Sequence, residues 1–108
     1  MNIANIQKAT SWFEVLQTTE RSQTAVMTLI PGGETGPHPE AHEKSEQTML
    51  VVSGRMKGTI GSEDVHLEAG DVVVIPAGEP HHFKNDDELP AVSFNVYAPP
   101  EYPADEKG

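Results

Sequence analysis

The sequence predicts a single, small all-β domain built as an antiparallel barrel or sandwich. Three observations lead to this fold class. Short apolar runs rich in Val, Ile, Thr and Phe recur along the chain. Glycine, proline or acidic clusters interrupt these runs about every eight to twelve residues. Helical periodicity is scarce, and 108 residues are enough for one hydrophobic core but too few for two.

The expected strands are the segments that hold these apolar runs: residues 24–30, 47–53, 55–60, 65–67, 71–75, 81–84 and 91–97. We expect one domain over residues 1–108, with a core barrel over about 22–98. Residues 1–21 form an N-terminal strand segment, and residues 99–108 form an extended acidic tail that lies on the surface. Four large side chains fit the lining of the barrel: Met27, Met49, Met56 and Phe94.

Composition excludes several classes of function and of site. The chain has no cysteine, so any metal must bind to nitrogen and oxygen. Seven basic and seventeen acidic residues give a formal charge of -10, which repels nucleic acid and anionic lipid. No apolar run approaches the length of a membrane span, and the N-terminus lacks a leader pattern. We therefore expect a cytoplasmic protein without nucleic-acid or membrane partners.

Two runs, at residues 49–52 and 72–75, are apolar at every position instead of alternating. This pattern is typical of strands that are covered on both faces. One barrel has only one interior, so the second face must be covered by the N-terminal segment with Trp12, Phe13 and Leu16, or by another subunit. The sequence predicts a homodimer.

The histidines and carboxylates have spacings that suit a metal site. His38, Glu40 and His42 alternate, so in an extended segment all three point to the same side. A charged break separates them from Gln47, and His81 follows a Pro-Ala-Gly turn much later in the chain. Histidine combined with oxygen donors suits first-row divalent metals.

Two segments resemble the pair of motifs that define the cupin superfamily. The first is Glu40-x-His42, four residues, Gln47, six residues and Gly54, where the cupin motif has His-x-His, three or four residues, Glu, six residues and Gly. The second is similar to the other cupin motif at every defined position: Gly70, five residues, Pro76-x-Gly78, two residues, His81, three residues and Asn85. The chain is thereby identified as a member of the cupin superfamily, of the small single-domain type.

The resemblance implies a jelly-roll β-barrel that holds one divalent metal, with iron, manganese, nickel, cobalt and zinc all suited to its ligands. The ligands implied are His42, His81, Gln47 and Glu40. Glu40 stands where the motif has histidine and Gln47 where it has glutamate, so the two changes offset each other in charge. His38 lies on the same face and is the alternative to Glu40 as ligand or hydrogen-bond partner. Either residue is a candidate general base.

Other polar residues have plainer interpretations. His66 lies in an alternating stretch beside charged neighbours, and His82 points away from His81 by strand parity, so neither is expected to bind metal. Asn95 and Tyr97 share one face of the last expected strand and are candidates for contact with a ligand.

The leading functional hypothesis is metal-dependent chemistry on a small polar metabolite, of the oxygenase or the isomerase/lyase type. Fold alone does not choose between these reactions. A non-catalytic module that binds a small molecule is the second hypothesis. A degenerate site that has lost its metal, leaving a structural dimer, is the third.

Overall fold

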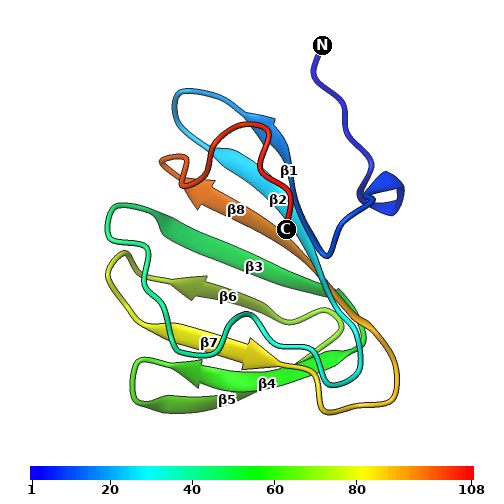
Figure 1. Ribbon diagram of the computed structural model, residues 1–108. Helices are drawn as coiled ribbons and strands as arrows, with labels where there is room; N and C mark the ends of the chain where they lie inside the picture. Colours follow the sequence, from blue (N-terminus) through cyan, green and yellow to red (C-terminus); the bar gives the residue numbers. More distant parts are fainter.

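The computed structural model describes residues 1–108 as eight strands and one short 3-10 helix (Figure 1). Two sheets face each other, with strand orders β1-β2-β8-β3-β6 and β5-β4-β7, and every pairing is antiparallel. The elements are η1 (Ile6–Lys8), β1 (Phe13–Thr18), β2 (Gln23–Leu29), β3 (Glu46–Ser53), β4 (Arg55–Ile60), β5 (Glu63–Glu68), β6 (Val72–Ile75), β7 (His81–Lys84) and β8 (Ala91–Ala98). The predicted all-β jelly-roll fold is confirmed.

Every expected strand is present, with its ends within about two residues of the prediction. The structure adds β1, which lies within the segment 1–21 that was expected to hold a strand, and pairs with β2 through a register shift between Val15 and Gln17. No helix in the structure is long and apolar enough to cross a membrane.

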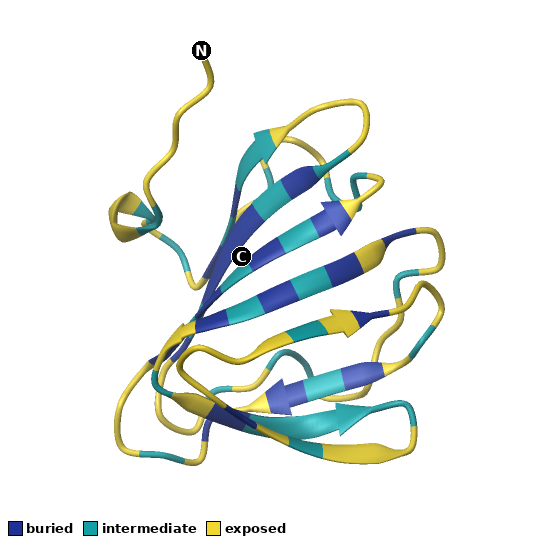
Figure 2. Ribbon diagram, turned by 180° about the vertical axis from the view of Figure 1, so that it is seen from behind, coloured by how far each residue is buried: buried dark blue, intermediate teal, exposed yellow.

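Strand alternation determines which side chains form the core. Along β2, β3 and β8 the odd-numbered residues are buried, except Ser53 after a register shift at the end of β3, and Figure 2 shows the resulting stripes. The apolar part of this interior includes Met27, Met49, Met56 and Phe83. The same faces of β3 and β8 also carry buried polar residues, Gln47, Ser93 and Asn95, at the end of the barrel where the candidate site lies.

Phe94 does not line the barrel as expected. It has even parity in β8, so it lies on the outer face of the five-stranded sheet between Val26 and Leu50. The two all-apolar runs are likewise covered on only one face within the chain. Val52, Val72 and Val74 remain 41%, 60% and 54% exposed, so no other part of the chain covers them.

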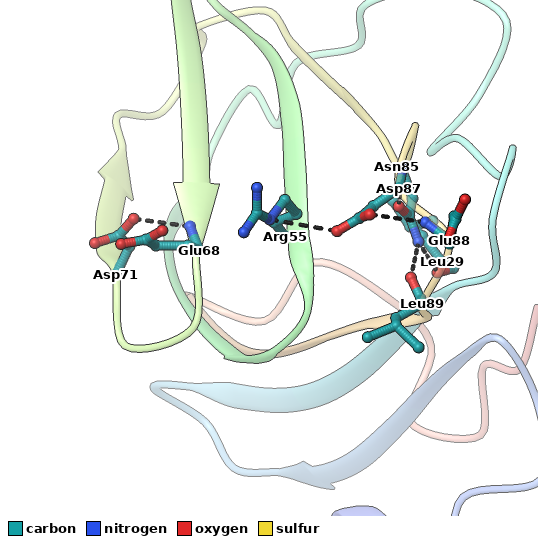
Figure 3. Close-up of polar contacts among 8 residues, drawn as sticks. All are labelled: Leu29, Arg55, Glu68, Asp71, Asn85, Asp87, Glu88 and Leu89. Atoms are coloured by element: carbon teal, nitrogen blue, oxygen red, sulfur yellow. Dashed lines mark hydrogen bonds and ion pairs between the residues drawn. The ribbon is translucent and has the colours of Figure 1, made fainter.

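Asn85 fixes the loop that carries the chain from one sheet to the other (Figure 3). Its buried amide donates to the carbonyls of Leu29 and Leu89, at 2.9 and 2.8 Å, and its side-chain oxygen accepts from the backbone of Asp87 at 2.9 Å. Asp87 also lies 3.3 Å from the guanidinium of Arg55 at the start of β4. This explains why an asparagine follows β7 at the position that matches the second motif.

The last ten residues, expected to form an extended surface tail, are mostly exposed but do not extend away from the barrel. They fold back along β1, where the amide of Val15 donates to the carbonyl of Glu106 and the amide of Gly108 donates to the carbonyl of Phe13. The buried side chain of Gln23 accepts from the amides of Glu101 and Tyr102 and donates to the carbonyl of Tyr102. Backbone hydrogen bonding, which composition does not reveal, holds this segment against the barrel.

Replacing Gln23 with alanine is expected to destabilise the fold by about 1–3 kcal/mol, because buried backbone groups of the C-terminal segment lose their partners. Urea denaturation followed by circular dichroism measures this loss. Gln7→Ala is the matched control, since Gln7 is exposed in the short 3-10 helix. A Gln23→Ala variant as stable as the Gln7→Ala control would contradict the proposed anchoring role.

Candidate metal and ligand site

A cavity of about 210 Å³ lies between the sheets at one end of the barrel. Strand ends, the loop before β3 and the C-terminal segment all contribute to its wall. The residues that line it are Trp12, Phe13, Met27, Thr35, His38, Glu40, His42, Gln47, His81, Phe83, Tyr97, Tyr102, Glu106 and Gly108. The predicted site residues therefore share one cavity.

Backbone pairing brings His42 and His81 together from distant parts of the chain. The amide of Glu40 donates to the carbonyl of His81 at 3.0 Å, and the amide of His81 donates to the carbonyl of Glu40 at 2.9 Å. Gly78 holds the next turn, because its amide donates to the carbonyl of His42 at 2.8 Å while its own φ is 82°. As a result, the centres of the two imidazole rings lie 4.9 Å apart.

His81 is in the protonation state that binds metals. Its Nδ1 lies 3.1 Å from the carbonyl oxygen of Glu79. A carbonyl can only accept, so Nδ1 carries the hydrogen and Nε2 keeps a free lone pair. Burial lowers the pKa of His81 below its usual range, and the neighbouring His42 lowers it further. The ring is therefore neutral near pH 7.

His42 is held by the C-terminal segment. Its Nδ1 lies 3.2 Å from a carboxylate oxygen of Glu101, and its ring meets the edge of Tyr97 at 5.3 Å between ring centres. A carboxylate beside Nδ1 favours a proton on that atom. The lone pair of Nε2 is then available to coordinate a metal. Sequence reasoning missed Glu101, because no motif connects it with His42.

Gln47 carries the clearest sign of a missing partner. Its side chain is buried, and its amide nitrogen donates to the side-chain oxygen of Asn95 at 2.9 Å. Asn95 in turn donates to the hydroxyl of Ser93 at 3.1 Å, which fixes the direction of both amides. The remaining atom, the Oε1 oxygen of Gln47, is the one buried side-chain polar atom in the chain without a hydrogen-bond partner.

Glu40 and His38 line the same cavity with side chains that are exposed overall. The charge of Glu40 acts on the imidazole of His81, where it opposes the lowering of the pKa. No three His, Asp or Glu side chains lie close enough together to form a ligand set of their own. The nearest match to the predicted set is the pair of imidazoles together with the free oxygen of Gln47. Glu40 and His38 contribute to the lining of the cavity with exposed side chains.

The residues present fit a divalent metal. Two imidazoles and one unpartnered amide oxygen are nitrogen and oxygen donors of the kind that first-row metals accept, and three donors leave coordination positions for a ligand. His66 and His82 lie elsewhere, as predicted: His66 is exposed on β5, and Nε2 of His82 contacts the carbonyl of Gly36 at 2.6 Å.

Aromatic residues form one side of the cavity. The ring of Tyr102 lies 4.9 Å from that of Phe13 and 5.2 Å from that of Tyr97. Burial raises the pKa of Tyr97 far above its ordinary value and also raises that of Tyr102. Both hydroxyls therefore stay protonated at neutral pH. The inward position of Tyr97 and Asn95 follows the predicted parity, whereas Tyr102 lies in the segment assigned to the surface.

Comparison with known proteins identifies the family. The family described as "Cupin domain" matches residues 25–97, which is more than half of the chain. This chain belongs to the cupin family. Among related proteins, this cupin is 33% identical over 85 residues to SCO3923 of Streptomyces coelicolor, covering 76% of this chain and 75% of the relative. It is also 28% identical over 111 residues to YrkC of Bacillus subtilis. That match covers 94% of this chain but only 59% of YrkC, which is the longer protein.

Solved structures confirm the fold of this cupin. The BH2720 protein of Bacillus halodurans superposes with a TM-score of 0.86 at 23% identity, covering 94% of this chain and 80% of that one. A predicted oxalate decarboxylase from Thermotoga maritima gives 0.73 at 22% identity, covering 82% and 77%. A putative sugar phosphate isomerase from Acidithiobacillus ferrooxidans gives 0.64 at 22% identity, covering 72% and 50%. At these identities the likeness shows the shared fold alone.

A pH titration checks the burial of the aromatic wall, because both tyrosines of the chain belong to it. We expect no tyrosinate absorbance at 295 nm as the folded protein passes about pH 10, the usual pKa of tyrosine. A raised pKa in the folded state means that unfolding releases protons, so the free energy of unfolding falls as the pH rises above about 10. The guanidinium-unfolded chain, titrating near about 10, is the control. Half of the full absorbance appearing near that pH in folded protein would contradict the geometry.

Proposed function

We propose that this cupin binds one divalent first-row metal per chain through His42, His81 and Gln47, and acts on a small polar metabolite in the cavity. The single observation that carries the proposal is the buried, unpartnered oxygen of Gln47. Leaving such an oxygen without a partner costs about 1–3 kcal/mol. A bound cation accounts for that cost, and the hydrogen bond from Gln47 to Asn95 aims the oxygen in advance.

Glu40 is the proposed fourth ligand, with His38 as its alternative. The backbone bonds between Glu40 and His81 hold Glu40 beside one proposed ligand, and both Glu40 and His38 line the cavity that the other proposed ligands line. Whichever residue does not bind is available as a general base beside the ligand. The metal, once bound, supplies Lewis acidity toward a carbonyl or hydroxyl oxygen of that ligand.

The residues of the chain have separate roles in such a reaction. The hydroxyl of Tyr97 remains protonated, so it is available to donate a hydrogen bond to the ligand. Phe13 and Tyr102 keep water from one side of the ligand. These roles serve oxygenase chemistry as well as isomerase or lyase chemistry. A predicted oxalate decarboxylase and a putative sugar phosphate isomerase are among the structural neighbours, so lyase and isomerase chemistry come to this chain as candidates, and oxygenase chemistry rests on the proposed metal site alone.

A non-catalytic binding module is the second candidate. The observation that favours it is the lack of any three His, Asp or Glu side chains placed together, since catalytic metal sites often use such sets. In this case the same cavity holds a small molecule without turnover.

Elemental analysis of protein purified without chelator tests the metal site. We expect about one equivalent of metal per chain. His81→Ala should lose the metal while the barrel stays folded, and Gln47→Ala should weaken metal affinity by about 10–100-fold because one oriented donor is lost. His66→Ala is the control and should retain the metal, since His66 is exposed on another sheet. Stoichiometric metal in His81→Ala would refute the site.

We also propose that two chains form a homodimer through the outer face of the five-stranded sheet. Two rows cross this face without a charged residue. One holds Thr24, Val96, Thr48 and Val74, and the other holds Phe94, Leu50 and Val72, next to Val26, which the chain itself already buries. The rest of the surface carries a formal charge of -10, which opposes association everywhere except on such an uncharged face. A two-fold axis would bring this surface against its own copy, as in most soluble oligomers.

Val74→Lys should therefore convert the dimer to a monomer, because burying an unpaired ammonium in an apolar interface costs several kcal/mol. Light scattering coupled to size-exclusion chromatography measures the mass in solution. Thr59→Lys, on the other sheet, is the control and should remain dimeric. Wild-type protein that is monomeric at micromolar concentration would sink the dimer proposal.

A further inference from the structure

The C-terminal segment makes the cavity apolar on one side. Tyr102 packs between Phe13 and Tyr97, and Trp12, which is partly exposed, extends this aromatic surface to the rim through its contact with Phe13. Flat aromatic surfaces favour a planar apolar partner, which stacks or meets them edge-on. A cavity of about 150 Å³ holds a benzene ring. The volume here, about 210 Å³, suits one ring with a small polar group.

The charges around the cavity have a single sign. Glu40 and Glu106 line it, and the carboxylate of Glu101 lies 3.2 Å from His42. No lysine or arginine lines it. The nearest lysine in sequence, Lys107, points instead to Thr10 and Glu14. Even with a divalent cation bound, the three carboxylates leave this site with a net negative formal charge. A phosphate or an additional carboxylate on the ligand would meet repulsion and no compensating partner.

We propose that the cavity selects a neutral or cationic ligand with a planar apolar part, and that it excludes ligands bearing phosphate or a carboxylate beyond the group that meets the metal. The inference rests on the metal site proposed above. The aromatic wall supplies the attraction, and the carboxylates at the mouth supply the exclusion. Glu106 contributes to the exclusion through its side chain alone, because its bonds to β1 and to Pro103 use backbone atoms.

Three hydroxamic acids with the same metal-binding group test the proposal on zinc-loaded protein: acetohydroxamic, benzohydroxamic and 4-carboxybenzohydroxamic acid. Zinc content is measured first, and binding is then measured by isothermal calorimetry. We expect benzohydroxamic acid to bind at least tenfold more tightly than acetohydroxamic acid, because only its ring reaches the aromatic wall. We expect the carboxylated ring to bind at least tenfold more weakly than the plain ring.

Glu106→Lys should reduce the difference in affinity between benzohydroxamic and 4-carboxybenzohydroxamic acid. It should leave the ratio of affinities for benzohydroxamic and acetohydroxamic acid unchanged. Glu88→Lys makes the same change of charge on the exposed loop between β7 and β8, and should leave both ratios as in the wild type. Equal affinities for the two ring compounds, or no gain from the ring, would overturn the selectivity. Protein that retains zinc and binds none of the three would also overturn it. Failure to retain zinc would instead refute the metal site and remove the basis of this inference.

Discussion

The two backbone hydrogen bonds between Glu40 and His81 are the contact on which the site depends. They join a loop before β3 to the first residue of β7, so that residues about forty positions apart enter one cavity. The spacing inside each segment then places the histidines. His42 follows Glu40 by two residues, and the amide of Gly78, in the turn before β7, donates to the carbonyl of His42. Without this pairing, nothing in the local sequence would bring His42 and His81 into the cavity that Gln47 also lines.

The candidate site places polar groups where a barrel of this size would otherwise gain stability from apolar packing. Gln47, Asn95 and Ser93 form a buried chain of hydrogen bonds, and a network of this kind is favourable only when each member is satisfied. One oxygen is not satisfied. An apolar residue at position 47 would remove this unsatisfied group but also a potential ligand, so the arrangement is easier to understand as a demand of function than of folding.

Much of this could be predicted from the sequence, because the informative signals are local. Strand parity placed Asn95 and Tyr97 inward, and His66 outward, and the motif spacing brought together the residues that line the cavity. What could not be predicted depends on contacts between distant segments. Glu101 and Tyr102 lie in an acidic, proline-bearing stretch that by composition resembles a solvated tail. Contacts with distant residues, among them the side chains of Gln23 and Ser45 and the edge of β1, hold it in place. Phe94 is hydrophobic, as a residue of the barrel lining would be, but its even position in β8 turns it to the outer face of the sheet.

The way in which the C-terminal segment is attached has a consequence for how such a protein can change. Gln23, β1 and Ser45 hold the segment by hydrogen bonds to its backbone carbonyls and amides, which do not depend on the identity of its side chains. Residues 101, 102 and 106 can therefore be exchanged while the attachment persists, as long as the new side chains fit. Over evolutionary time, such a barrel could acquire a new ligand preference by substitutions in a ten-residue border, with its metal-binding residues and its folding core left untouched.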